Sequence, residues 1–393
     1  MPRKNKNAYS RHNLVHIVRG GADYFSRIED IAARAKVSLH MQVYIFDEDD
    51  TGRLVADALK KAAQRNVAVY LLVDGYASKG LSDSFIADLK AAGIHFGFFQ
   101  PFLKSDSFYI GRRLHHKIMV ADGEICMVAG INVGNRYNDI GATPAWLDWA
   151  ICVEGEAAHQ IRLVCERVWN RSPFREKCKI SVKQDNTIPD ICEVRVRRND
   201  WVYNKTEITK TYRQAIQHAQ SEVTMMTSYF WPPHKLLVRM AAASRRGVKI
   251  KLVLTAKADV FLSKYTERYL YQWLFRNNIE IYEYQKNILH GKITVCDRQW
   301  LTGGSYNLNN ISAYASVELN LDVNDAGIAK EVSDELQAII DKDCVRIIPA
   351  DFSANNNVIQ KFFFYLSYRI VHIIFYLFTF YFRQKGSRRQ KAT

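Results

Sequence analysis

The chain has 393 residues, of which 48% are hydrophobic, and a formal net charge of +15 at pH 7. This length predicts at least two domains, each able to bury a core, and the charge suits a nucleic acid and an anionic membrane equally well. Seven cysteines without regular spacing argue against a disulfide-linked extracellular protein and for reduced thiols on the cytosolic side. No apolar run follows the basic N-terminus, so we expect no signal peptide.

The first 170 residues alternate between helical and extended patterns of apolar residues. Expected helices cover residues 24–35, 52–64, 83–92 and 157–170, and expected strands cover 37–46, 67–73, 94–99 and 148–153. This alternation predicts a largely parallel or mixed sheet with helices on its faces. We interpret the acidic cluster at 47–50 as a solvated loop or a helix N-cap rather than a catalytic group.

The segment 114–132 is the most informative stretch, because its pattern recurs at 289–307. Matched residues lie 175 positions apart: His115, Lys117, Asp122, Gly130 and Asn132 correspond to His290, Lys292, Asp297, Ser305 and Asn307. A lone histidine in an apolar strand is usually a packed core or edge residue, but a duplicated pattern of this length is not expected by chance. It indicates an internal duplication with a pseudo-twofold axis between the two segments.

Each copy predicts a β-hairpin, with its turn at residues 122–123 in the first copy. Side chains on a strand alternate between faces, so the histidine and the lysine of each copy should point the same way. If the turn centres on these two residues, His115 lies opposite Gly130, and the same count places His290 opposite Ser305.

This set of side chains suits the transfer of a phosphoryl group. Histidine can attack phosphorus or protonate a leaving oxygen, and lysine and asparagine can stabilise the equatorial phosphoryl oxygens. Two such patches facing each other need no metal or other cofactor, since Lys117 and Lys292 supply positive charge. We read Asp122 and Asp297 as turn formers or structural partners rather than proton carriers. A zinc site in these segments is disfavoured, because His-x-Lys is not ligand spacing and no Cys-x-x-Cys pair occurs.

The two segments resemble the paired HxK(x)4D motifs of the phospholipase D superfamily, and the surrounding sequence is similar to the bacterial cardiolipin synthases of that superfamily. Supporting residues lie at 44–52, 129–132, 146–148, 303–307 and 318–320, and the similarity runs from residue 12 to residue 345. The resemblance implies two tandem α/β sandwich domains related by pseudo-twofold symmetry. It also implies one shared active site and a covalent phosphohistidine intermediate.

The resemblance further implies a role for each residue of the site. The catalytic set is His115 as nucleophile and His290 as acid, with Lys117, Lys292, Asp122 and Asp297. Asp148 and Glu318 stand where acidic partners would orient the two histidines and favour their charged form. The substrate-binding set is Asn132, Asn307, Ser305 and Gly130. Since Gly130 lacks the hydroxyl that Ser305 carries, the halves are not expected to be equivalent.

The second half of the chain repeats the first after a change of composition. Expected helices lie at 208–219, 236–246, 263–275 and 330–342, and expected strands lie at 222–229 and 248–254. The expected units are a basic tail at 1–11, a first domain at 12–170, a connection at 171–200, a second domain at 201–345, and a linker, membrane helix and basic tail at 346–393.

Residues 362–382 form the second strong signal, since as a helix they would be about 31 Å long, close to the hydrocarbon thickness of a bilayer. One side of this helix carries the polar residues Lys361, Tyr365, Tyr368, Arg369, His372, Tyr376, Thr379 and Arg383. We favour an amphipathic membrane helix that lies near the interface or pairs through its polar stripe over a true span, which Arg369 and His372 disfavour, and over a buried soluble helix. The basic tail that follows should contact anionic headgroups.

The favoured function is cardiolipin synthesis by transphosphatidylation between two phosphatidylglycerol molecules, in a site shielded from water. The alternatives are a phospholipase D-type hydrolase, a nuclease of the same superfamily, and a non-catalytic membrane-binding protein. Expected partners are phospholipid substrates and an anionic membrane surface, with no nucleic acid. The expected location is the inner membrane, with the site on the cytoplasmic side. The donor lipid, the acceptor alcohol and the oligomeric state stay open.

Overall fold

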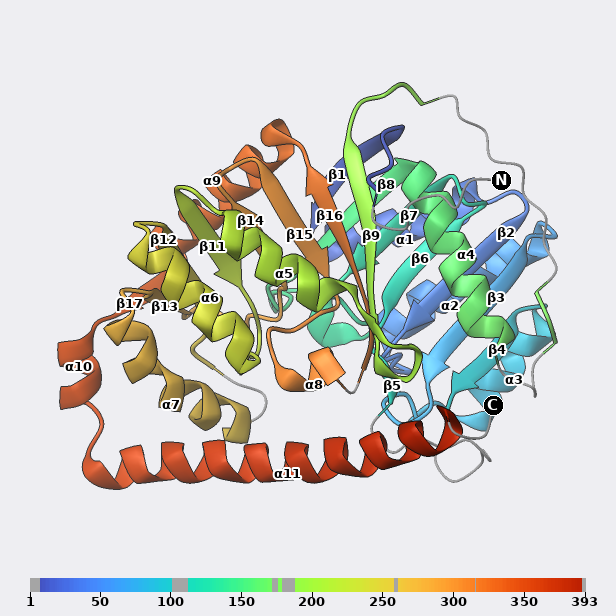
Figure 1. The fold of residues 1–393 in the computed structure, drawn as a ribbon. Coiled ribbons are helices and arrows are strands. Elements are labelled where there is room, and N and C mark those ends of the chain that lie inside the picture. Colours follow the sequence, from blue (N-terminus) through green and yellow to red (C-terminus); the bar gives the residue numbers. More distant parts are fainter. Residues whose placement is uncertain are drawn as a thin grey trace.

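The computed structural model describes residues 8–100, 112–171, 176–178, 188–257, 261–314 and 316–390, without the side chains of Tyr314 and residues 376–390. Most of the expected N-terminal tail and much of the expected connection lie outside these ranges. The described chain forms two mixed β-sheets with helices packed on them (Figure 1). This confirms the predicted α/β fold with two tandem units. We call residues 8–171 the first half and residues 188–345 the second half.

The first sheet has seven strands in the order β1-β8-β7-β6-β2-β3-β4. The strands β2, β3 and β4 are parallel neighbours, reached through helical crossovers, and the other pairs are antiparallel. The strands are β1 (Asn13–Arg19), β2 (Ser38–Val43), β3 (Ala68–Asp74), β4 (His95–Phe99), β6 (Lys117–Ala121), β7 (Ile125–Ala129) and β8 (Trp149–Gly155). The helices are α1 (Ala22–Arg34), α2 (Asp50–Gln64), α3 (Asp83–Ala91) and α4 (Glu156–Asn170).

The second sheet has the order β10-β9-β16-β15-β14-β11-β12-β13-β17, and β5 (Arg113–Leu114) pairs with β16. From β9 to β13 it repeats the order and directions of the first sheet, so the duplicated sequence is a duplicated topology. The strands are β9 (Glu193–Asp200), β10 (Lys205–Thr206), β11 (Glu222–Met226), β12 (Lys249–Thr255), β13 (Glu280–Tyr284), β14 (Ile293–Cys296), β15 (Trp300–Gly304), β16 (Ser316–Asn324) and β17 (Cys344–Ile347). The helices are α5 (Glu207–His218), α6 (His234–Arg245), α7 (Phe261–Arg276), α8 (Asn310–Tyr314) and α9 (Ala326–Asp343).

Local sequence explains where several helices begin. The side chains of Asp49, Ser82 and Asp325 accept hydrogen bonds from backbone N–H groups at the starts of α2, α3 and α9. For Asp49 this confirms the N-cap interpretation of the acidic cluster. One apolar core includes residues of both sheets, among them Ile151 of β8 and Leu301 of β15. The junction between the halves is therefore packed like a protein interior.

The two motif hairpins differ from the expected register by one residue. Their turns contain three residues, 122–124 and 297–299, because the first two residues of each adopt a left-handed backbone conformation. Ala121 consequently pairs with Ile125. Continuing that register places His115 opposite Ile131 rather than Gly130. The position opposite His290 likewise moves one residue beyond Ser305.

Strand β9 occupies the end of the segment that we expected to be a connection. The sequence of β9 does not show the apolar alternation typical of a strand, because it carries the charged residues Arg195 and Arg197. Both are ion-paired with the buried Asp322 of β16. Helix α10 (Pro349–Ala354) likewise lies in the expected linker and buries Phe352. Buried charges and a single apolar anchor give no clear periodic signal in the sequence.

Helix α11 (Val358–Gln390) is longer than predicted and runs along the lower side of the molecule in Figure 1, packed on α7. The side that faces the protein is mainly apolar and aromatic, and it includes Tyr368 of the polar stripe: Phe364, Ser367, Tyr368, Val371 and Phe375. The outward side exposes apolar residues that include Ile359, Phe362, Phe363 and Ile373. By length and composition Val358–Phe375 could cross a membrane, and 11% of that window is buried inside the protein.

Candidate active site

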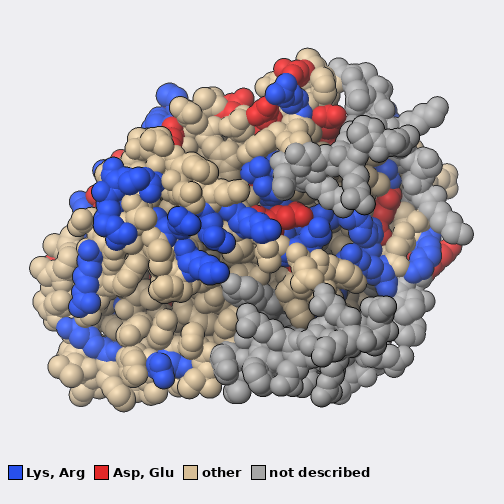
Figure 2. Space-filling model, in the orientation of Figure 1, with Lys and Arg blue, Asp and Glu red and all other residues tan. Residues whose placement is uncertain are grey.

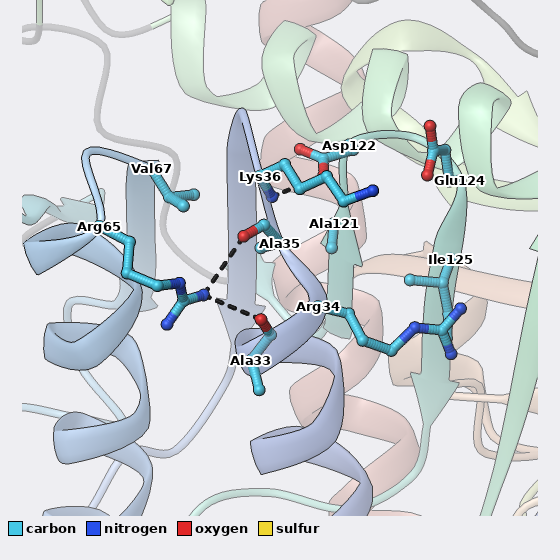
Figure 3. Close-up of a pocket in the computed structure, with 10 residues that line it drawn as sticks. All are labelled: Ala33, Arg34, Ala35, Lys36, Arg65, Val67, Ala121, Asp122, Glu124 and Ile125. Carbon is cyan, nitrogen blue, oxygen red and sulfur yellow. Dashed lines mark hydrogen bonds between the residues drawn. The ribbon is translucent and has the colours of Figure 1, made fainter.

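The turn end of each motif hairpin is fixed by its aspartate. Each carboxylate accepts hydrogen bonds of 2.7–3.0 Å from three consecutive backbone N–H groups: Lys36, Val37 and Ser38 for Asp122, and Gln220, Ser221 and Glu222 for Asp297. Asp122 and Lys36 line a cavity of about 530 Å³ (Figure 3). Asp122 follows the last residue of β6, whereas Lys117 is the first residue of that strand. The structure therefore does not bring the two aspartates to the histidines, and both act as anchors of the fold.

Each histidine is placed by a main-chain contact with the opposite half. Strand β5 pairs with the start of β16, and the N–H of His115 donates to the carbonyl of the residue before Glu318 at 3.0 Å. The N–H of His290 donates to the carbonyl of the residue before Asp148 at 2.8 Å. The two contacts have the same register, so each imidazole comes next to a carboxylate of the other half.

The two histidine–carboxylate pairs are close, and both carboxylates are buried. Nδ1 of His115 lies 2.9 Å from Oε2 of Glu318, and Nδ1 of His290 lies 2.6 Å from Oδ2 of Asp148. Glu318 is 0% exposed and Asp148 is 1% exposed. A carboxylate on Nδ1 favours the tautomer with the proton on that nitrogen, which leaves Nε2 as the atom available for chemistry.

Gly130 and Ser305 differ because each lies against one of these two carboxylates. A Cβ atom at Gly130 would lie 2.3 Å from Oδ1 of Asp148, so this position has no room for a side chain. The hydroxyl of Ser305 instead donates to Oε2 of Glu318 and accepts from the N–H of Leu319. Both positions serve the carboxylates in this structure, whereas the sequence analysis assigned them to substrate.

The two motif asparagines differ in their surroundings. Asn132 accepts a hydrogen bond from the N–H of Ile45 at 3.1 Å and donates to the hydroxyl of Tyr137 at 3.0 Å, so its amide holds the local fold. Oδ1 of Asn307 is buried and has no hydrogen-bond partner among the described residues. A buried acceptor without a partner is costly, which makes Asn307 the better candidate for contacting a substrate hydroxyl.

Both motif lysines are 1% exposed. Nζ of Lys117 donates to the carbonyl of His115 at 3.0 Å and lies 5.2 Å from the centre of the Tyr44 ring. Nζ of Lys292 donates to the hydroxyl of Ser228 at 3.0 Å. Burial lowers the pKa of Lys117 to about 7, while the charge of Glu318 opposes this shift. An anionic phosphate would favour the charged ammonium.

Burial also lowers the pKa of both histidines. The pKa of His290 falls to about 4, with Lys292 adding to the shift and Asp148 opposing it. The pKa of His115 falls below its ordinary value although Glu318 opposes the change. Both imidazoles are thus neutral at pH 7 before substrate binds. A neutral imidazole is a nucleophile, and the negative charge of a bound phosphate would help the other imidazole to hold a proton.

Two further residues, which no sequence motif indicates, bind the backbone just before each histidine. Oδ2 of Asp74 accepts from the N–H of Leu114 at 2.9 Å, and Oγ1 of Thr255 accepts from the N–H of Leu289 at 3.3 Å. Both are buried at the carboxyl ends of the corresponding strands β3 and β12. Sites in α/β sheets gather at such strand ends, so a search for polar residues there would have found both.

A profile described as "Cardiolipin synthase, PLD-like domain" matches residues 28–146 and 212–340. The chain is 32% identical to cardiolipin synthase B of Salmonella typhimurium over 342 residues, which cover 85% of this chain and 82% of that protein. It is 27% identical to a cardiolipin synthase of Halalkalibacterium halodurans, with coverage of 77% and 61%. A crystal structure of phosphatidylserine synthase from Haemophilus influenzae has the same fold, with a TM-score of 0.68, 12% identity and coverage of 87% and 89%.

Proposed function

The chain belongs to the cardiolipin synthase family of phospholipase D-like proteins, and on that basis we propose that it transfers a phosphatidyl group from one phosphatidylglycerol to the hydroxyl of another, releasing glycerol. The observation that carries the proposal is the crossed pairing of His115 with Glu318 and of His290 with Asp148. Because each pair draws one residue from each half, the two halves make a single site with two imidazoles.

When the anionic phosphate binds, His290 takes up a proton from solvent. In the first step Nε2 of His115 then attacks phosphorus and the bond to the glycerol oxygen breaks, while His290 donates that proton to the glycerol oxygen. In the second step neutral His290 takes the proton of the incoming hydroxyl. The hydroxyl oxygen then attacks phosphorus, the bond to His115 breaks, and both histidines return to their starting states. Lys117 and Lys292 stabilise the charge on the equatorial oxygens.

Aromatic side chains surround both histidines. The ring of Tyr44 lies 4.9 Å from that of His115, and the rings of Tyr137 and Trp146 lie 5.4 and 5.9 Å from that of His290. Such surroundings disfavour water at the phosphohistidine, which supports transfer to a lipid hydroxyl over hydrolysis.

The direct test is lipid turnover by the purified full-length protein on phosphatidylglycerol vesicles without added metal, with products analysed by mass spectrometry. We expect cardiolipin and free glycerol in equal amounts. Phosphatidic acid without cardiolipin would make the protein a hydrolase and overturn the proposed transfer. If no product forms, mixed vesicles with phosphatidylethanolamine test whether the donor lipid is different.

We further propose that the protein sits on the cytoplasmic face of the inner membrane, with the outward side of α11 in the interface. Figure 2 shows Lys and Arg side chains gathered in a belt over α5 and α6, with few acidic side chains among them. Basic residues of these helices at the surface are Lys210, Arg213, Lys235, Arg239 and Arg245. This charge supports contact with anionic headgroups, and the exposed apolar side of α11 supports insertion beside them.

Replacing four outward residues of α11 by serine tests this placement: Phe362, Leu366, Ile370 and Ile373, all at least 38% exposed. Each apolar side chain moved into lipid contributes about 1.5–3 kcal/mol. We therefore expect binding to anionic vesicles to weaken by at least about 100-fold in sedimentation assays. The matched control replaces Val37, which lies between α1 and β2, and Leu163 of α4, which are exposed apolar residues outside α11. Unchanged vesicle binding by the α11 variant would contradict the placement.

A further inference from the structure

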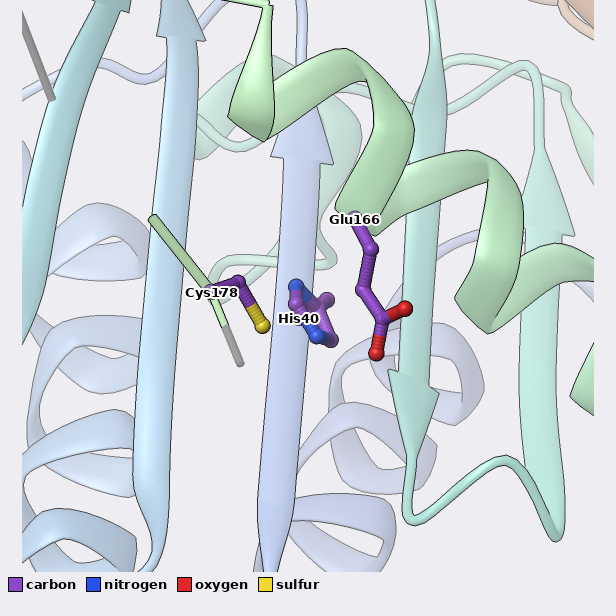
Figure 4. Close-up of side chains that lie close together, drawn as sticks. All are labelled: His40, Glu166 and Cys178. Atoms are coloured by element: carbon purple, nitrogen blue, oxygen red, sulfur yellow. The ribbon is translucent and has the colours of Figure 1, made fainter. Parts of the chain in front are cut away.

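A second cluster of chemically active side chains lies on the α4 side of the first sheet. It consists of His40 on β2, Glu166 on α4 and Cys178 beyond the end of α4. One potential ligand atom from each residue, a ring nitrogen, a carboxylate oxygen and a thiol sulfur, lies within 4.8 Å of the others. Figure 4 shows His40 between Cys178 and Glu166, which approach it from opposite sides. The proposed transfer chemistry uses none of these residues.

His40 is the strongest reason to expect a ligand here. It is 1% exposed, and its Nε2 has no hydrogen-bond partner among the described residues. A buried polar atom left without a partner is costly, so such an atom calls for a bound group. Its ring stacks on that of Tyr70 at 4.8 Å, which fixes its plane. A neutral imidazole offers a nitrogen lone pair to a cation.

The other two residues can complete a coordination set. Arg162 donates to Oε1 of Glu166, which leaves the second carboxylate oxygen for a ligand while the arginine orients the group from behind. Cys178 is buried and is not part of a disulfide. Nitrogen, sulfur and carboxylate oxygen together are the donors that zinc takes, whereas calcium and magnesium prefer oxygen alone.

We propose that His40, Glu166 and Cys178 bind a zinc ion, with a water molecule in the fourth tetrahedral position. Binding forms a metal–sulfur bond and releases the thiol proton to solvent. The ion would link the chain after α4 to the interior strand β2 and so fix the point at which the chain leaves the first half. Gln42, on the same face of β2, hydrogen-bonds His116 between the two motif residues His115 and Lys117, so the clamp would also stiffen the backing of the first motif. Its role is structural and lies outside the transfer reaction.

The test is the metal content of the full-length protein purified from zinc-supplemented cells, measured by inductively coupled plasma mass spectrometry. We expect about one zinc per chain, lost at least tenfold in Cys178→Ser and in His40→Gln. The matched control is Cys192→Ser, which changes another buried cysteine and should keep its zinc. Zinc should also protect Cys178 of the wild-type protein from alkylation.

If a variant does not fold, cobalt binding to the wild-type protein tests the proposed site without any substitution. Apoprotein titrated with Co²⁺ should develop a thiolate-to-cobalt absorption band in the near ultraviolet, and zinc should displace it. The absence of both zinc and this band in the wild-type protein would overturn the proposal. So would full zinc content in a folded Cys178→Ser variant, because the ion would then be held elsewhere.

Discussion

Replacing His115 or His290 by alanine is expected to reduce the rate of cardiolipin formation on the order of 10⁴-fold or more. Each imidazole has a role that the other cannot take over, because one forms the bond to phosphorus and the other moves the proton. The two sit in one site through contacts between the halves, so losing either should be as damaging as losing both. Turnover on phosphatidylglycerol vesicles measures the loss.

The matched control for this experiment is His16→Ala, which changes an exposed histidine on β1. It should keep full activity, and circular dichroism should show all three variants folded. Rapid denaturation of the working enzyme, followed by mass spectrometry, should find the phosphatidyl group on the peptide that contains His115. Robust synthesis by either alanine variant would contradict a single site shared by the halves.

The fold and the two motif histidines could be predicted from the sequence because both predictions rest on a repeated pattern. A pattern at constant spacing survives errors in any one element, and the matched strand orders of the two sheets follow from it. The predicted register of the hairpins was wrong by one residue. The register depends on whether the turn has two or three residues, and the three-residue turn arises from left-handed conformations at Asp122 and Gly123. Sequence patterns near a turn do not fix that number.

The pairing of residues across the site could not be read from the sequence. Asp148 and Glu318 are each near their own half's motif in the chain, yet each contacts the histidine of the other half. Only the main-chain contacts between the halves settle this. The same holds for Asp74 and Thr255, which support the site through backbone N–H groups and therefore carry no motif. The aromatic packing of α11 on α7 was not predicted either, because it depends on partners far away in the chain.

Removing the charge of Asp148 or Glu318, the carboxylates that pair with the histidines of the opposite halves, is expected to have the second large effect on activity. Asp148→Asn and Glu318→Gln keep the shape of each side chain but remove its charge, and we expect kcat to fall by about 10²- to 10⁴-fold in each variant. An amide can offer an N–H group to Nδ1, which favours the tautomer with the proton on Nε2 and spoils the reactive nitrogen. The loss of negative charge also destabilises the imidazolium, so the pKa of the paired histidine falls further.

The two variants should move opposite limbs of the pH–rate profile, which separates the roles of the histidines. If His290 is the acid, its activity requires the proton, so Asp148→Asn shifts the alkaline limb to lower pH. If His115 is the nucleophile, its activity requires the neutral ring, so Glu318→Gln shifts the acidic limb to lower pH. The reverse pattern would exchange the two roles while leaving the shared site intact. Variants that lose activity with no movement of either limb would show that the carboxylates hold the fold and do not tune the histidines.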